Sequence, residues 1–205
     1  MATTTRIEFV FDFGSPNAYL AHQIIPGIEK RTGAKFEYLP ALLGGIFKAT
    51  NNQSPMLAFG GVKGKLAYEQ KETERFMHRH GITKFQPNPF FPVNTLQIMR
   101  GLVAAQLDGD MVPYLNAVLH HMWEAPKKMD DPDVIRAALT QSGLDAERIM
   151  ARMQDPDVKA RLIENTESAV SRGAFGIPTF FLGSEMFFGK DRLRDVEEAI
   201  MAGAR

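Results

Sequence analysis

The sequence predicts an α/β protein in which a β–α–β unit and a later β–β–α unit enclose a long run of helices. Residues 7–13 alternate large apolar residues with other types, the period-2 pattern of a buried strand, and a helical pattern follows directly. Between residues 63 and 173 every convincing pattern is helical, and residues 179–188 return to two short strands. We therefore expect one sheet assembled from the two ends of the chain, with a helical insertion between its second and third strands.

The junction between the first strand and the first helix is the most informative stretch. Gly14 permits a sharp turn, Ser15 is a favoured N-cap, and Pro16 suits the first helical position, where its missing N–H costs nothing. Apolar residues recur at helical spacing as far as Gly33, which predicts the C-terminal stop. A hydroxyl at a helix N-terminus, beside free N–H groups and the positive end of the helix dipole, can hold an anion. Capping alone is the simpler interpretation of Ser15 at this point.

A second strand and a Gly- and Asn-rich connection follow the first helix. Residues 35–39 alternate again and end at Pro40, and a right-handed crossover predicts that this strand is parallel to the first. Residues 44–61 are rich in Gly and Asn and are too many for a tight turn. This stretch is therefore predicted to be a functional loop or a domain connection.

The helical insertion is divided by recognisable start and stop signals. A helix over residues 63–80 ends at Gly81, and the Pro-rich residues 86–92 break the run. Asn94 or Thr95 can cap the helix that follows. Further helices are predicted to start near Met111, Asp131, Asp145 and Asp155.

The last thirty residues predict a hairpin and a closing helix. Strands over 179–182 and 185–188 are separated by two residues, and Gly183 at the first turn position suits a type II′ turn. A helix is expected over 191–201, with Asp191 as a natural N-cap.

Composition excludes several classes of function. The 24 Lys and Arg residues are matched by 24 Asp and Glu residues, so no broad basic face for nucleic acid is expected. No apolar run approaches the length of a membrane span, and Met1–Thr5 lack the apolar segment of a signal peptide. These observations predict a soluble protein in the cytoplasm with neither nucleic acid nor membrane as a partner.

The chain contains no cysteine. Disulfides, Cys-ligated metals and a CxxC redox motif are therefore excluded, and any thiol chemistry must use a thiol brought by a ligand. The pairs His78 with His80 and His120 with His121 have spacings that place their rings on different helix faces, so no metal site is expected.

The element order, with Ile177-Pro178-Thr179 just before the third strand, is that of the thioredoxin-like fold. A proline at this place, beside the N-terminus of the first helix, is the hallmark of that fold, and we therefore expect the Ile177–Pro178 bond to be cis. Such a bond would turn the N–H and C=O of Ile177 outward, toward a peptide-shaped ligand. The predicted domains are a discontinuous thioredoxin-like domain, residues 1–60 and 174–205, and a helical insertion domain, residues 61–173.

Three segments carry a closer resemblance that covers nearly the whole chain. They are Phe11-Asp12-Phe13-Gly14-Ser15-Pro16-Asn17-Ala18-Tyr19, Asn88-Pro89-Phe90-Phe91-Pro92-Val93-Asn94-Thr95 and residues 173–193. Together they resemble the 2-hydroxychromene-2-carboxylate isomerases, relatives of the kappa-class glutathione transferases in the DsbA-like branch of the thioredoxin superfamily.

The resemblance implies a glutathione site. Ser15 stands where a thioredoxin relative carries its nucleophilic cysteine, and its hydroxyl would donate to the glutathione sulfur and hold the thiolate. The backbone of Ile177, next to Pro178, would pair with the cysteinyl unit, and Asp191 would meet the γ-glutamyl amino group. The further residues implied are Asn52 and Lys190 for glutathione, and Lys48, Asn51, Asn52 and Asn88 for the substrate.

Two positions depart from the family pattern. Lys190 replaces the small hydroxyl residue of the kappa-class relatives, and Phe90 replaces a histidine of many isomerase-like sequences. The γ-glutamyl contact and the substrate contacts are therefore expected to differ from those of the family.

The implied reaction is a glutathione-dependent cis–trans isomerisation of an aromatic keto acid, in the catabolism of polycyclic aromatics such as naphthalene. The thiolate would add to the conjugated double bond, allow rotation and leave again, so that glutathione is not consumed. A kappa-like transferase that releases a conjugate and a non-catalytic glutathione- or peptide-binding protein remain alternatives. Relatives are commonly homodimers, and the sequence itself does not test this.

Overall fold

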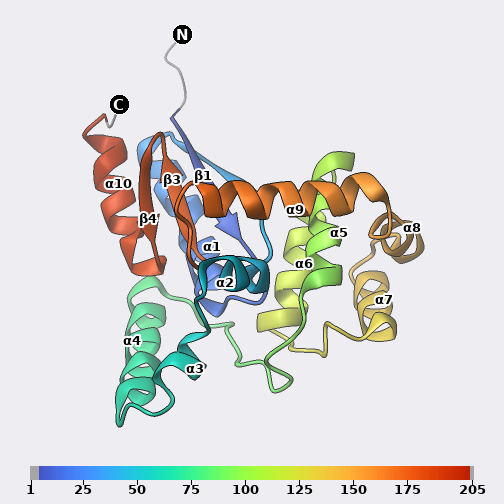
Figure 1. The fold of residues 1–205 in the computed structure, drawn as a ribbon, viewed down its shortest axis with the longest axis horizontal. Helices are drawn as coiled ribbons and strands as arrows, with labels where there is room; N and C mark the ends of the chain where they lie inside the picture. Colours follow the sequence, from blue (N-terminus) through green and yellow to red (C-terminus); the bar gives the residue numbers. More distant parts are fainter. Residues whose placement is uncertain (1–4, 204–205) are drawn as a thin grey trace.

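The computed structural model describes residues 5–203, and its centre is a four-stranded mixed sheet (Figure 1). The strands are β1 (Arg6–Phe11), β2 (Lys35–Pro40), β3 (Thr179–Leu182) and β4 (Glu185–Phe188), in the order β2-β1-β3-β4. β2 is parallel to β1, whereas β3 is antiparallel to both β1 and β4. The prediction of one sheet built from both ends of the chain is confirmed.

Helix α1 (Pro16–Thr32) has the predicted boundaries. Ser15 caps its first turn, Pro16 occupies the first helical position, and Gly33 ends it with a φ of 73°. The hairpin is also as predicted, because Gly183 has a φ of 59° and begins the two-residue turn between β3 and β4.

The helices α4 to α9 lie between β2 and β3 in the sequence, as expected for the helical insertion (Figure 1). α9 runs from the side of the sheet across α5 to α8 and contacts β2 and α2 as well as α5, so it connects the sheet to the helical insertion (Figure 1). The helices that follow β2 are α2 (Leu43–Thr50), α3 (Pro55–Phe59), α4 (Lys65–His80), α5 (Leu96–Asp108), α6 (Met111–Trp123), α7 (Pro132–Gln141), α8 (Ala146–Arg152), α9 (Pro156–Ser171) and α10 (Leu193–Met201). The division into two domains remains a prediction.

The core of the sheet is aromatic. Phe9, Phe11, Phe13 and Phe180 are completely buried, and the rings of Phe9 and Phe180 stack with centroids 4.9 Å apart. Pairs of this kind stabilise a fold beyond the area that they bury, by ~0.5–1.5 kcal/mol each. The predicted strand over 7–13 is two residues too long, because Asp12 and Phe13 leave β1 while Phe13 stays in the core.

The prediction that residues 44–61 form a loop is wrong, because this stretch contains α2 and α3. Gly45 has a helical conformation and packs against α9, where an added Cβ would lie 3.1 Å from Thr166 Cγ2. The glycine therefore permits close helix packing rather than a turn, a role that depends on a partner far away in the sequence.

The predicted closing helix begins later than expected. Residues Lys190–Arg192 form a 3₁₀ turn, and α10 starts at Leu193. Asp191 therefore lies inside the turn, and its side chain makes no cap hydrogen bond. At α5, Asn94 Oδ1 accepts a hydrogen bond from Leu96 N at 3.1 Å, so Asn94 rather than Thr95 supplies the side-chain acceptor.

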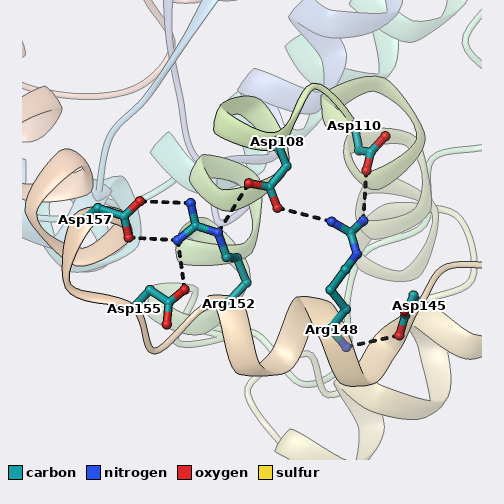
Figure 2. A network of polar contacts seen from close by, with 7 residues as sticks. All are labelled: Asp108, Asp110, Asp145, Arg148, Arg152, Asp155 and Asp157. Carbon is teal, nitrogen blue, oxygen red and sulfur yellow. Dashed lines mark hydrogen bonds and ion pairs between the residues drawn. The ribbon is translucent and has the colours of Figure 1, made fainter.

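Two arginines on α8 hold the helical insertion together (Figure 2). Arg148 bridges Asp108 and Asp110 at the α5–α6 turn, with Nη1 and Nη2 at 3.2 and 2.8 Å from their carboxylates. Arg152 contacts Asp108 and also Asp157, with which it forms two parallel hydrogen bonds at 2.8 and 2.9 Å. Arg152 holds the pKa of Asp157 down at about 2. The network joins α5, α8 and α9 by charge-assisted bonds, of which the Arg152–Asp157 pair is bidentate.

Within residues 5–203, no helix is long and apolar enough to cross a membrane. Over the same range, no group of three or more His, Asp or Glu side chains is arranged to hold a metal ion. The prediction that no signal peptide is present rests on Met1–Thr5, and residues 1–4 lie outside the described part of the chain.

Candidate functional site

The turn between β1 and α1 is organised by a buried carboxyl group. Asp12 Oδ1 accepts from Gly14 N at 2.8 Å, and Asp12 Oδ2 accepts from Leu43 N at 2.7 Å. Burial raises the pKa of Asp12, while these two N–H groups and the Thr95 hydroxyl act in the opposite direction. Asp12 thus connects the turn that carries Ser15 to the first turn of α2.

Ser15 is 4% exposed and makes two side-chain hydrogen bonds. Its Oγ accepts from Ala18 N at 3.2 Å, which is the predicted cap. The hydroxyl also donates to the carbonyl oxygen of Ile177 at 2.9 Å. A serine has only one hydroxyl proton, and here it is directed to Ile177 O.

The segment before β3 has the predicted cis bond between Ile177 and Pro178. Its conformation is supported by hydrogen bonds from Thr179 Oγ1 to Gly176 O at 2.8 Å and from Gly189 N to Pro178 O at 2.9 Å. The expectation that both backbone groups of Ile177 face outward is wrong for the C=O, which Ser15 holds. The N–H of Ile177 has no hydrogen-bond partner among the described residues.

Asn52 brings the end of α2 to this segment. Its Nδ2 donates to Phe175 O at 2.7 Å, and its Oδ1 accepts from Gln53 N at 2.8 Å. Asn51 is exposed and ends α2 with a φ of 53°, a conformation that asparagine tolerates better than most residues. Lys48 is exposed on the last turn of the same helix. The α2 terminus therefore places all three predicted residues together, and Asn52 alone contacts the segment before β3.

Lys190 and Asp191 differ in exposure. The Lys190 side chain is 7% exposed, and its Nζ lies 2.9 Å from Asp191 Oδ2 and 4.9 Å from the centre of the Phe76 ring. The Asp191 side chain is 68% exposed, so its carboxylate faces solvent. A buried ammonium group thus positions an accessible carboxylate.

Asn88 is buried and fully hydrogen-bonded within the protein. Its Nδ2 donates to Met122 O and Lys127 O, both at 3.1 Å, and its Oδ1 accepts from Phe90 N at 2.9 Å. These bonds attach the Pro-rich loop to the helical insertion, and they leave the Asn88 amide no free donor for a ligand.

Comparison with known proteins agrees with this geometry. The family described as the DsbA-like thioredoxin domain matches residues 6–201. The chain belongs to the DsbA-like thioredoxin family. It is 28% identical over 197 residues to a 2-hydroxychromene-2-carboxylate isomerase of Pseudomonas putida, covering 95% of this chain and 93% of the relative.

Two further comparisons support the same relationship. This DsbA-like protein is 28% identical over 200 residues to human glutathione S-transferase kappa 1, covering 91% of this chain and 87% of the relative. The solved structure of a 2-hydroxychromene-2-carboxylate isomerase superposes with a TM-score of 0.80 at 27% identity and covers 98% of this chain and 96% of the other. Relatives that match along the whole chain are therefore isomerases and transferases, and the predicted resemblance is confirmed.

Asp12 and Trp123 contribute to the site of this DsbA-like protein and were not predicted to do so. Trp123 Nε1 donates to Phe13 O at 2.9 Å, which attaches α6 to the turn before Ser15. A signal for Asp12 exists in the sequence, because it is a carboxylate placed between two core phenylalanines, Phe11 and Phe13. No comparable signal marks Trp123, whose partner is a backbone atom 110 residues away.

Proposed function

We propose that this protein catalyses the glutathione-dependent cis–trans isomerisation of 2-hydroxychromene-2-carboxylate to trans-o-hydroxybenzylidenepyruvate. The observation that carries the proposal is the hydroxyl of Ser15, held at the N-terminus of α1 and 2.9 Å from the Ile177 carbonyl beside a cis-proline. The isomerase relatives, matched over more than nine-tenths of both chains, give the proposed substrate class.

The residues present fit glutathione. The tripeptide offers a thiol, backbone amides and an α-amino group, and each has a suitable counterpart here. The counterparts are the Ser15 hydroxyl with the N-terminus of α1, the N–H of Ile177, which has no partner within residues 5–203, and the exposed carboxylate of Asp191. Because the chain has no cysteine, the only thiol available to the reaction is the one that the ligand brings.

In the proposed mechanism, Ser15 and the N-terminus of α1 would hold the sulfur of glutathione, which would supply a reversible thiolate nucleophile for the conjugated double bond. Ser15 would stabilise the sulfur anion with a hydrogen bond from its hydroxyl, which would turn toward the sulfur from Ile177 O. The N–H groups and dipole of α1 add further stabilisation.

The substrate side of the site is proposed to be the end of α2. Lys48 is a solvent-facing cation there and would donate to the negative oxygen that forms when the thiolate adds. Asn51 and Asn52 supply neutral donors beside it, while Asn88 contributes by holding the Pro-rich loop. The exposed rings of Phe59, Phe90, Phe91 and Phe175 would cover a flat aromatic acid.

An absorbance assay with 2-hydroxychromene-2-carboxylate, with and without a catalytic amount of glutathione, tests the proposal. We expect fast equilibration that requires glutathione without consuming it. Equilibration without glutathione, or the absence of turnover, would contradict it. Consumption of glutathione with electrophiles would instead favour a kappa-like transferase, the alternative that the human relative supports. Binding of glutathione without any turnover would favour a non-catalytic binding protein.

We further propose that the protein acts as a cytoplasmic homodimer in the catabolism of polycyclic aromatics such as naphthalene. Exposed apolar side chains of α3 and the following turn offer a surface for such a dimer, with Met56 at 61%, Leu57 at 73% and Val62 at 53% exposure. Light scattering coupled to size exclusion would measure the mass, and a monomer at micromolar concentration would contradict the dimer.

A further inference from the structure

A hollow separate from the proposed glutathione site lies between α2, α5 and α9. Its volume is about 520 Å³, within the roughly 300–1,000 Å³ of small-molecule sites. Neither Ser15, Asn52, Ile177 nor Asp191 lines it. The apolar side chains of its walls are Leu42, Ala49, Leu96, Leu162, Ile163 and Val170.

Arg100 is the unusual residue of these walls. Its Nε is buried without a hydrogen-bond partner, and no ion pair within residues 5–203 includes its guanidinium group. Arg100 as a whole is partly exposed, so only its Nε–H is cut off from water. This unsatisfied donor costs free energy, and the accessible part of the guanidinium can receive a ligand oxygen. The group best suited to a guanidinium edge is a carboxylate, because it accepts two parallel hydrogen bonds.

The other charged side chains at the hollow limit the charge of the ligand. Lys159 and Glu167 also line it, and within residues 5–203 neither takes part in an ion pair. Arg100 and Lys159 are cations and Glu167 is an anion, so these three side chains leave one positive charge for a ligand to neutralise. The apolar walls disfavour a second anionic group, and Glu167 would repel one.

We infer that this hollow binds a small apolar monocarboxylate, with its carboxylate on Arg100 and its hydrocarbon part between α2 and α9. The inference does not depend on the proposed glutathione chemistry. A hydrogen bond of 3.0 Å from Leu42 N to Thr166 Oγ1 connects the start of α2 directly to α9. A bound acid would add contacts between them, so ligand binding should also raise the melting temperature.

Calorimetric titration of the full chain with 2-naphthoate tests the inference, with 2-naphthamide as the uncharged analogue. We expect saturable binding of 2-naphthoate that Arg100→Met weakens by about tenfold or more, while the weaker binding of 2-naphthamide stays the same. Arg161→Met, which removes an exposed arginine of α9 outside the hollow, is the matched control and should bind like the wild type. Circular dichroism checks that Arg100→Met is folded.

A second variant and a competition experiment locate the site. Ala49→Met fills the hollow from α2 and should abolish binding, and methyl resonances of Ile163 should shift on titration of the wild type. Excess glutathione should not compete, and Ser15→Ala should bind 2-naphthoate normally. Unchanged affinity in Arg100→Met, displacement by glutathione, or no binding at about 10 mM acid would each overturn the inference.

Discussion

The Ser15 hydroxyl donates to the carbonyl oxygen of Ile177 at 2.9 Å, across 162 residues of sequence. This bond joins the start of α1 to the segment before β3, and it uses the only proton that Ser15 can donate. In the proposed function, the hydroxyl would turn from Ile177 O toward the thiol of glutathione.

The first prediction concerns this hydroxyl. Ser15→Ala should lower turnover by about 10²–10³-fold, because one preorganised donor to the anionic sulfur is lost. It should also raise the pKa of the enzyme-bound glutathione thiol, which is measurable from thiolate absorbance in the ultraviolet. Ser54→Ala is the matched control, because Ser54 caps α3 in front of Pro55 just as Ser15 caps α1 in front of Pro16. Equal loss of activity in both variants would reduce the role of Ser15 to capping.

The second prediction concerns Asn52 and its 2.7 Å hydrogen bond to Phe175 O. Asn52→Ala should raise the KM for glutathione about fivefold with a smaller change in kcat, since it removes a bond worth ~1 kcal/mol that holds the segment before β3. Asn51→Gly preserves the left-handed end of α2 and serves as control. If both variants have the KM of the wild type, the contact does not position this segment for glutathione.

The third prediction is a loss of stability in mild acid. Burial lowers the pKa of His22 to about 4, and burial with the charge of Lys127 lowers that of His121 to about 4. Between pH 6.5 and 4 the unfolded chain binds protons that the folded protein does not, so the free energy of unfolding should fall as pH falls. Each histidine should contribute ~1.4 kcal/mol per pH unit to the slope, and this contribution should level off below pH 4.

Urea unfolding at a series of pH values measures this slope. His22→Gln can still form a hydrogen bond with the Tyr38 hydroxyl, and it should reduce the slope by the contribution of one histidine. Replacement of the exposed His78 by Gln should leave the slope unchanged. A stability that stays constant from pH 6.5 to 4 would contradict the buried, neutral state of His22.

The fourth prediction concerns the ion-pair network of the helical insertion (Figure 2). Arg152→Met should lower the melting temperature, because it leaves Asp108 and Asp157 close together without their shared cation. This decrease in melting temperature should be smaller in 1 M salt, because the screening length is then about 3 Å and interactions between charges near the surface are weakened. Removal of the isolated, exposed Arg161–Glu164 pair by Arg161→Met should have little effect at either salt concentration. If Arg152→Met and Arg161→Met lowered the melting temperature equally, the network would stabilise the protein no more than an isolated ion pair does.

Much of the fold was predictable because its signals are local. The cap at Ser15, the stop at Gly33, the turn at Gly183 and the Asp-Pro helix starts each depend on residues within one turn of the chain. Predictions failed where a distant partner decides the local structure. The local pattern around Gly45 favours a loop. The contact that instead makes this glycine useful in a helix is with Thr166, which lies 121 positions further along the sequence.

The sequence by itself determined the order of the strands and of the helices outside residues 44–61, the aromatic strand that forms the core, the hydroxyl at the start of α1 and the absence of any cysteine. Only the tertiary structure decided that Ser15 bonds Ile177, that Asn52 bonds Phe175, that Asp12 is buried between the turn and α2, and that Arg100 faces an apolar hollow. The physical reason is that capping and periodicity act within a few residues of each other. The burial and pairing of a polar group depend instead on which distant segments pack around it.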